Sequence, residues 1–361
     1  MSKKIGILTF HRAINHGAVL QCYALYKTLE KLGHDVIVID YRQPYIEKLY
    51  RPNRKIIISD EVQKVLQNPR WIPGYVFKIL FQRYKTRNFC KRLYKELRFT
   101  PCVECAEDFP DNMDAIVVGS DQVWANYCTN GIDKIYYGEF AHGNAKIIGY
   151  AISSNLESLI ENGNKKLKRL CKNFNSISFR EEEISRYLQE KVGISSTVVL
   201  DPTLLINREE WDRIAYNVII KKPKKYILTH FLNDDFNRRA LNDNINYIAK
   251  RKGSKIIELD KVAHSPEEFI SWIKDAEHVI TSSFHATVFS IIYKKHFLAL
   301  RTNNGRDIRY INLLKKLKLS SQLTDPHGID EKINRKIEYN QTEQILTKEQ
   351  KLSIKYIKDC L

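Results

Sequence analysis

Long hydrophobic runs are missing from this sequence. No apolar run approaches the roughly 18 residues that a membrane-spanning helix needs, and the first one, residues 5–10, is too short for the core of a secretory signal peptide. Cysteine is also sparse: the seven cysteines are widely spread, and their odd number does not suit a disulfide framework. These absences predict a cytoplasmic protein in a reducing compartment.

Cofactor motifs are missing as well. The only CxxC joins Cys102 and Cys105, and without a second pair or a neighbouring histidine cluster it does not predict a metal or redox site. The loop after the first predicted strand, residues 11–17, lacks the GxGxxG pattern of dinucleotide-binding domains. We therefore expect neither a metal nor a cofactor.

Positive charge is unevenly distributed. The formal net charge is +17, and the stretch from Arg42 to Arg98 holds 15 Lys and Arg residues against 4 Asp and Glu, with aromatic residues interleaved. Such a segment suits the anionic inner face of the plasma membrane, so a peripheral membrane contact is expected. The alternative is a solvated helical insert whose aromatic residues form a small core of their own. Nucleic acid is not expected, because no RRM or zinc-finger motif accompanies the charge.

Alternating strand and helix patterns continue through most of the 361 residues, more than a single hydrophobic core usually holds. We predict an α/β protein of two Rossmann-like domains facing across a cleft, with a basic helical insert in the first. The predicted domains are residues 1–206, including the insert at 42–110, and residues 207–345, followed by a C-terminal helix at 346–361. Predicted strands include residues 5–10, 34–40, 146–153, 225–232, 255–259 and 296–300. Predicted helices include residues 18–32, 156–171, 239–252, 266–276, 286–293 and 347–360.

A strand-to-helix corner around residue 285 is the principal candidate site. Val279 and Ile280 end a predicted strand, a turn with helix-capping chemistry follows, and His285 stands where the next helix starts. Such corners line the ligand crevice of open α/β sheets, and a helix N-terminus attracts anions. We interpret His285 as a catalytic acid or base and Ser282 and Ser283 as substrate-binding residues; the alternative is a histidine that only caps its helix. Three arginines after the next predicted strand supply positive charge: Arg301, Arg306 and Arg309.

Similar corners occur in the first predicted domain. Asp121 follows a buried apolar run and is the candidate general base there; the alternative is a residue that caps the next segment. Arg180 ends another short strand, where a guanidinium can hold a carboxylate or phosphate through two hydrogen bonds; the alternative is a surface salt bridge to Glu181. Asn15 and Gly17 lie where the first helix starts and can offer backbone N–H groups to a ligand.

Five motifs, in sequence order, carry a resemblance to the polysaccharide pyruvyl transferase family that runs through nearly the whole chain. They are Thr9-Phe-His-Arg-Ala-Ile-Asn-His-Gly-Ala-Val-Leu-Gln21, Val118-Gly-Ser-Asp-Gln-Val-Trp124, Ser178-Phe-Arg-Glu181, Leu200-Asp-Pro-Thr203 and Ser282-Ser-Phe-His-Ala286. The resemblance implies a GT-B-type fold, with the acceptor on the N-terminal domain and the donor on the C-terminal domain. It also implies transfer of a pyruvyl ketal from phosphoenolpyruvate to two hydroxyls of a sugar, in a bacterial surface polysaccharide or its lipid-linked precursor.

The resemblance also assigns roles to candidate residues. His285 and Arg180 match a histidine and an arginine that are tied to binding or activating phosphoenolpyruvate in the family. Several members have an arginine two positions before the histidine, where this sequence has Ser283, so one of the three later arginines is expected to supply that charge. His285 would then protonate the donor while Asp121 assists a sugar hydroxyl, and Arg180 with Arg301 would hold the donor.

Two other functions fit the same pattern. A nucleotide-sugar glycosyltransferase shares the two-domain architecture, and fold alone does not settle function. No acidic ribose-binding residue stands out late in the second predicted domain, which argues against it. A non-catalytic subunit of a glycan-assembly complex is the other alternative, and the joint presence of His285, Arg180 and Asp121 argues against that reading.

Overall fold

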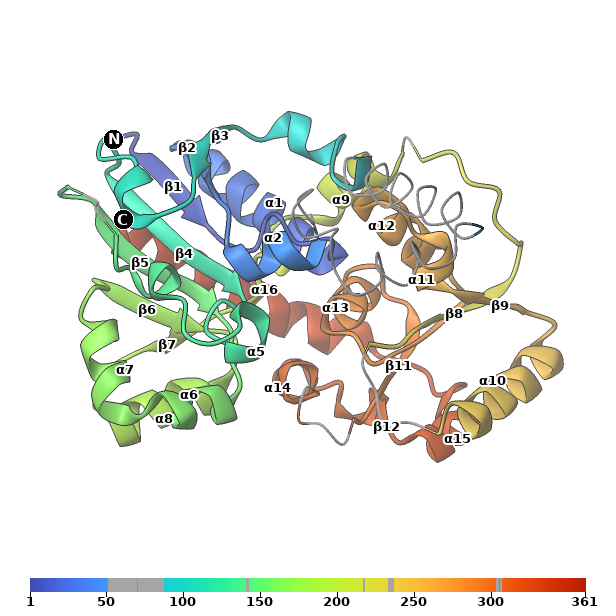
Figure 1. The fold of residues 1–361 in the computed structure, drawn as a ribbon. Coiled ribbons are helices and arrows are strands. Elements are labelled where there is room, and N and C mark those ends of the chain that lie inside the picture. Colours follow the sequence, from blue (N-terminus) through green and yellow to red (C-terminus); the bar gives the residue numbers. More distant parts are fainter. Residues whose placement is uncertain are drawn as a thin grey trace.

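The computed structural model describes residues 1–50, 70, 88–140, 143–216, 218–232, 237–302, 305 and 307–361. These residues form two α/β halves, each built on its own parallel sheet (Figure 1). The predicted α/β class is therefore confirmed. Within the described ranges, no helix is both long enough and apolar enough to cross a membrane.

The first sheet has seven parallel strands in the order β3-β2-β1-β4-β5-β6-β7. Its strands are β1 (Lys4–Leu8), β2 (Asp35–Tyr41), β3 (Phe99–Val103), β4 (Ala115–Asp121), β5 (Lys146–Ile152), β6 (Ser176–Phe179) and β7 (Thr197–Val198). The central strands β1 and β4 are almost fully buried, as expected for a parallel sheet covered on both faces. The strand order changes direction between β1 and β4, and ligands bind at such switch points.

The second sheet has five parallel strands in the order β12-β11-β10-β8-β9. Its strands are β8 (Tyr226–His230), β9 (Lys255–Glu258), β10 (His278–Thr281), β11 (His296–Leu300) and β12 (Leu323–Thr324). Here the order changes direction between β8 and β10. Each half therefore has its own switch point, and the loops after the strands on either side of it are the expected ligand-binding loops.

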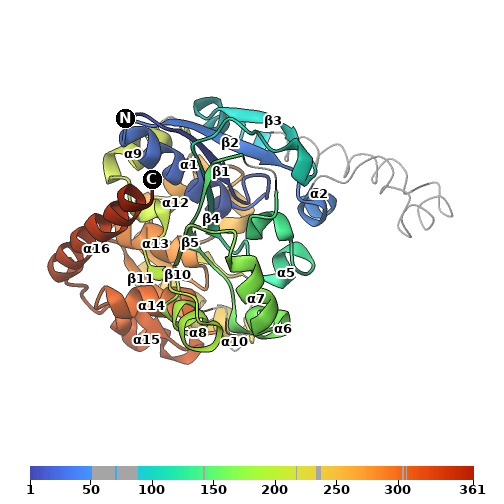
Figure 2. The same cartoon turned by 90° about the vertical axis from the view of Figure 1, so that its left-hand side faces the viewer.

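Helices connect the strands and cover the sheets (Figures 1 and 2). The first half contains α1 (His16–Lys31), α2 (Pro44–Tyr50), α5 (Asn126–Thr129), α6 (Leu156–Asn162), α7 (Asn164–Cys171) and α8 (Glu182–Tyr187). The second part of the chain contains α9 (Arg208–Tyr216), α10 (Arg238–Lys252), α11 (Leu259–Val262), α12 (Pro266–Asp275), α13 (Phe284–Ile292), α14 (Ile308–Lys316), α15 (Ile329–Lys332) and α16 (Tyr339–Cys360). Helix α1 packs against α12 and joins the two halves.

Some elements differ from the sequence prediction. The helix expected at 156–171 is two helices, α6 and α7, because Gly163 between them has a φ of 75° and a left-handed residue cannot continue a right-handed helix. The insert expected at 42–110 is not only helical, since it supplies β3 as an edge strand; most of residues 51–87 lie outside the described ranges. The C-terminal helix begins at Tyr339 rather than at residue 346.

Helix α16 links the two halves and lies on the outside of the molecule (Figure 2). Near its start, the Thr342 hydroxyl donates to the Leu317 carbonyl oxygen in the second half at 3.1 Å. Further along, the Ser353 hydroxyl accepts a hydrogen bond from the Leu200 backbone N–H in the first half at 2.9 Å. The largest buried core cluster includes side chains from both halves, so the two sheets share one continuous core.

Candidate active site

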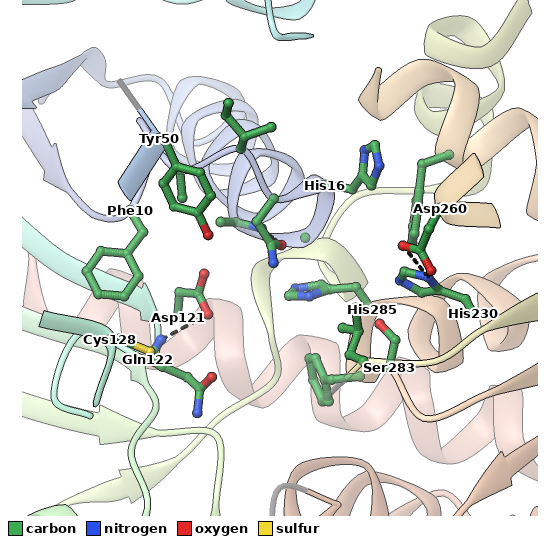
Figure 3. Close-up of a pocket in the computed structure, with 18 of the residues that line it drawn as sticks. Phe10, His16, Tyr50, Asp121, Gln122, Cys128, His230, Asp260, Ser283 and His285 are labelled. Atoms are coloured by element: carbon green, nitrogen blue, oxygen red, sulfur yellow. Dashed lines mark hydrogen bonds and ion pairs between the residues drawn. The ribbon is translucent and has the colours of Figure 1, made fainter. Parts of the chain in front are cut away.

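His285 stands at the strand-to-helix corner that the sequence predicts. Strand β10 ends at Thr281, and Ser283 caps α13 by accepting a hydrogen bond from the Ala286 backbone N–H at 3.4 Å. Because Ser283 is the cap, the view of His285 as a capping residue is wrong, and its imidazole points into the space between the halves (Figure 3). Its Nε2 lies 3.7 Å from Oδ2 of Asp201, a charge contact too long for a hydrogen bond.

The start of α1 lies directly against the His285 ring. Asn15 caps this helix by accepting from the Ala18 backbone N–H at 3.1 Å. Gly17, in the first turn, leaves no side chain between the helix and the imidazole, because a Cβ there would overlap Nδ1 of His285. Glycine is thus required by close approach rather than by an unusual backbone angle. The N-terminal ends of α1 and α13 meet at this histidine.

Arg180 follows β6 and enters a buried cluster of carboxylates. Its Nε donates to the Ser120 hydroxyl at 2.9 Å and lies 3.0 Å from Oδ2 of Asp201. Its Nη2 lies 3.6 Å from Oδ1 of Asp121. A continuous chain of charge contacts therefore runs from His285 through Asp201 and Arg180 to Asp121.

The guanidinium of Arg180 is buried, so the alternative of a surface salt bridge is wrong. The side chain packs over the Phe284 ring, with its central carbon 5.2 Å from the ring centroid. Glu181 is also buried and accepts from the Ser153 hydroxyl at 2.6 Å; burial raises the pKa of Glu181 despite the charge of Arg180. Among the described residues, Nη1 and Nη2 of Arg180 have no hydrogen-bond partner. These N–H groups can receive an anion.

Asp121 ends β4 in the left-handed region, with a φ of 82°. Aspartate tolerates this conformation better than most side chains. Its Oδ1 accepts from the Gln122 backbone N–H at 2.9 Å, and the next helix, α5, is capped by Ala125, so the capping alternative is wrong. Figure 3 shows Asp121 and His285 facing the same space from opposite halves.

The first sequence motif supports the turn that carries Asp121. The Thr9 hydroxyl donates to the Ser120 carbonyl oxygen at 2.8 Å. The Gln21 side-chain amide in turn donates to the Thr9 hydroxyl at 2.8 Å. All three residues are buried, so this network fixes the turn rather than contacting solvent. The motifs at residues 9–21 and 118–124 are therefore connected by hydrogen bonds in the folded protein.

Asp201 also belongs to the charged cluster, although the sequence analysis did not predict it as a site residue. It is buried and accepts from the Thr203 backbone N–H at 2.9 Å. Burial acts to raise its pKa, but the charge of Arg180, with His285 and Thr203, outweighs burial and holds the pKa well below its usual range. Asp201 is therefore ionised at neutral pH. In the sequence, Asp201 belongs to the motif Leu200-Asp-Pro-Thr203, which was used only as evidence for the family and not to predict a site residue.

A cavity of about 700 Å³ lies between the two halves in front of His285 (Figure 3). The predicted site residues that line it are Asn15, Gly17, Asp121, Ser282, Ser283, His285 and Arg309. Its aromatic lining consists of Phe10, Tyr45, Tyr50, Phe89, Tyr127, Phe269 and Phe284. A cavity of this size, where the switch points of two sheets meet, is the expected place for a substrate.

The three arginines after β11 differ in their placement. Arg309, on α14, lines the cavity. Arg301 is exposed, and the lining of the cavity, as far as the structure describes it, does not include that residue. Arg306 lies outside the described residues. Arg309 is thus the best placed of the described pair to supply the charge that is absent at Ser283.

A second histidine–carboxylate pair, which the sequence analysis did not predict, lines the cavity on the side of the second half, where His285 also lies (Figure 3). Nδ1 of His230, the last residue of β8, lies 3.1 Å from Oδ2 of Asp260. Burial opposes ionisation of Asp260, but His230 and His16 lower its pKa. His16 stacks on Phe269, with ring centroids 4.9 Å apart. The sequence feature that could have marked His230 as a site residue is its position near the carboxyl end of a predicted strand.

Metal-binding side chains do not gather in the part of the chain that the structure describes. No group of three or more His, Cys, Asp or Glu residues there is placed to hold a metal ion. Cys102 and Cys105 of the CxxC are free thiols. Hydrogen bonds from the Cys105 thiol to Glu107 and Asp108 raise its pKa, which makes it a poorer nucleophile and ligand.

Two Rossmann-like halves with a cavity between their switch points define a GT-B fold, and one solved structure with a TM-score of 0.50 agrees. UDP-GlcNAc 2-epimerase from Neisseria meningitidis, bound to UDP-GlcNAc, matches 99% of this chain and 99% of its own, with a TM-score of 0.50 and 11% identity. UDP-GlcNAc 2-epimerase from Methanocaldococcus jannaschii matches 96% and 99% (TM-score 0.46, 16% identity). MurG from Acinetobacter baumannii matches 99% and 99% (TM-score 0.42, 11% identity). At these identities the likeness concerns the fold alone.

The family model for polysaccharide pyruvyl transferase matches residues 15–304, which is most of the chain. The chain therefore belongs to the polysaccharide pyruvyl transferase family, as its five motifs predict. No curated protein matches the sequence.

Proposed function

We propose that this protein transfers the pyruvyl group of phosphoenolpyruvate to two hydroxyls of one sugar, in a bacterial surface polysaccharide or its lipid-linked precursor. The product is a pyruvate ketal, and inorganic phosphate is released. The observation that carries the proposal is the buried chain of charges from His285 through Asp201 and Arg180 to Asp121, beside the cavity of a pyruvyl transferase family member.

The donor carries a carboxylate and a phosphate, so its site needs fixed cations and N–H groups rather than an apolar slot. Arg180 offers buried Nη groups with no hydrogen-bond partner in the described structure. Arg309 adds a second guanidinium at the cavity wall. The N-terminus of α13, with its positive dipole end, lies beside both His285 and the cavity. These groups favour an anionic donor.

Ketal formation begins with a proton on the vinyl carbon, C3, and a new bond from C2 to the first sugar oxygen. We assign the proton to His285, whose Nε2 lies 3.7 Å from the buried carboxylate of Asp201. We assign the removal of a hydroxyl proton to Asp121, which faces the same cavity. The C2–O bond to phosphate then breaks, its electron pair leaves with phosphate, and the second hydroxyl closes the ring. Of the two hydroxyl protons, one replaces the proton that His285 gave to C3 and the other leaves with the phosphate.

The acceptor in this proposal occupies the main cavity. Its volume of about 700 Å³ and its mixture of aromatic faces with polar groups suit one or two sugar rings better than a small anion alone. A lipid-linked acceptor would bring the protein to a membrane, and the basic stretch 42–98 supplies the charge for such a contact. Most of that stretch lies outside the described residues.

The test is thermal stabilisation of the purified protein by phosphoenolpyruvate, beside UDP-GlcNAc and a GDP-sugar. A ligand at about 100 times its dissociation constant adds roughly 2.7 kcal/mol to the free energy of unfolding. We expect stabilisation by phosphoenolpyruvate and none by the nucleotide sugars. Stabilisation by a nucleotide sugar alone would overturn the proposal and favour a glycosyltransferase, whose architecture this fold shares.

A further inference from the structure

The connection from α9 to β8 brings two apolar side chains to the surface at the outer edge of the second half (Figure 1). Tyr216, the last residue of α9, is 85% exposed, and Ile219 is fully exposed. Apart from Met1, these are the two most exposed large apolar side chains among the described residues. Single apolar residues are normal on a protein surface, so the surroundings of this pair decide what it means.

Contacts of the neighbouring residues hold Ile219 in its exposed position. Ile220 packs against the shared core. The Lys222 ammonium lies 2.7 Å from Oδ2 of Asp275 on α12. Ile220 and Lys222, which are held by the fold, therefore alternate with the exposed side chains of Ile219 and Lys221. The fold itself presents the isoleucine to the outside.

Positive charge surrounds the two apolar side chains. Residues 216–225 contain four lysines and no acidic residue. Ile219 also lines a groove of about 470 Å³ with three exposed cations from the end of the basic stretch: Lys91, Arg92 and Lys95. The carboxylates of this groove belong to Glu267, which is buried, and Glu268, which accepts a backbone hydrogen bond beside the start of α12. Exposed cations therefore predominate here, and such a surface attracts an anionic one.

The groove lies beside the main cavity. Asn88 lines the groove, and the next residue, Phe89, lines the cavity. In the second half, Ser265 lines the groove and Phe269 lines the cavity. The same two segments thus contribute to both spaces. A surface that contacts the groove is therefore next to the cavity in front of His285.

We propose that this docking face, formed by Tyr216, Ile219 and the exposed cations around them, binds an anionic lipid membrane. Tyrosine and aliphatic side chains enter the membrane–water interface, and each nearby Lys or Arg adds attraction to anionic headgroups. A protein partner fits less well, because lysine is depleted at protein–protein interfaces. The inference does not rest on the proposed reaction, although docking would bring the cavity close to lipid-linked sugars.

The experiment is co-sedimentation of the full-length protein with vesicles of phosphatidylcholine alone and of phosphatidylcholine mixed equally with phosphatidylglycerol. The wild type should bind the anionic vesicles and not the neutral ones. Ile219→Asp should weaken binding about 10-fold or more, because it removes an inserted apolar side chain and adds a repelled charge. Lys224→Gln should weaken binding about 5-fold. Both side chains are exposed, so folding is preserved.

Ile160→Asp and Lys165→Gln are the matched controls. Both residues are exposed, and they lie on α6 and α7 of the first half, away from the connection between α9 and β8 (Figure 1). Each control makes the same chemical change as its partner variant but outside the docking face. Neither should alter vesicle binding.

Weaker binding in both docking-face variants, with the controls unchanged, supports the inference. Equal binding in all five proteins shows that another part of the chain docks and overturns it, as does equal binding of the wild type to neutral vesicles. No binding of the wild type overturns it too, and sedimentation of the wild type and Ile219→Asp alone then shows whether the face joins two copies of the chain. The assay contains no phosphoenolpyruvate, so each of these outcomes leaves the proposed function standing.

Discussion

Gly17 and His285 touch across the boundary between the two halves of the protein. The glycine belongs to the first turn of α1 and the histidine to the first turn of α13, and a Cβ on the glycine would overlap the imidazole Nδ1. The position of the imidazole therefore depends on how the halves dock. The contact also gives a physical reason for a glycine inside a helix, where it otherwise lowers stability.

The Gly17 contact can be measured as a coupling energy. Gly17→Ala should lower the free energy of unfolding by about 1–3 kcal/mol, because the added methyl overpacks a filled site. In a His285→Ala background the same change should be neutral or stabilising, since alanine favours helix more than glycine does. Denaturant unfolding of the four proteins gives the coupling. Strictly additive effects would contradict the contact.

Replacing His285 tests its role in proton transfer. His285→Gln should lower turnover by about 10²- to 10⁴-fold at saturating phosphoenolpyruvate, because a positioned acid contributes that much. Phosphate release, with a glycan extract that the wild type pyruvylates as acceptor, is the measurement. His264→Gln, at an exposed histidine, is the control. A His285→Gln protein that keeps most of its turnover would exclude the histidine as the acid.

Asp201 should matter for stability as well as for chemistry. Asp201→Asn should cost about 3–5 kcal/mol at pH 7, because it leaves the buried charge of Arg180 less compensated. The folded-state pKa of Asp201 is depressed, so its contribution is complete above the ordinary aspartate value of about 3.9 and is lost as pH falls toward the folded pKa. Wild type and variant should therefore converge in acid. Asp243→Asn, at an exposed aspartate, is the control, and a constant difference at all pH values would contradict the linkage.

Glu181 should show the opposite dependence on pH. Burial raises its pKa in the folded state against the influence of Arg180 and Ser153, so folding favours the protonated form. Its ionisation therefore lowers stability at neutral pH, and the loss disappears as pH falls below the ordinary glutamate pKa. Glu181→Gln mimics the neutral form and should be more stable than wild type at pH 7 but not near pH 4. Denaturant titrations at both pH values check this, and a less stable variant at pH 7 would show that the carboxylate is needed.

Arg309 and Arg301 form a natural pair of variants. Arg309 lines the cavity in front of His285, whereas Arg301 is exposed and is not part of that lining in the described structure. Arg309→Ala should weaken phosphoenolpyruvate binding about 10-fold, as expected when one charge-assisted contact is lost. Arg301→Ala should have a smaller effect. Calorimetric titration compares them, and a larger loss in Arg301→Ala would reverse the assignment.

Local chemistry let the sequence predict many of the elements. Ser265 caps α12 by accepting from the Glu268 backbone N–H at 3.2 Å, as the capping-box pattern predicts. The Glu268 carboxylate reaches one residue further back than the pattern requires and accepts from the His264 backbone N–H at 2.7 Å. The corner that carries His285 was likewise predictable, because a buried strand, a capping turn and a helix follow one another within a few residues. Five short motifs were enough to identify the family.

The tertiary structure alone decided which of these residues meet. Asp201 belongs to the first half and His285 to the second, so their contact depends on the docking of the two halves. The same holds for Gly17 against His285 and for α16, which starts on one half and ends on the other. Local patterns fix backbone conformation because caps and turns act over a few residues. They cannot fix contacts between distant segments, which depend on how the whole core packs.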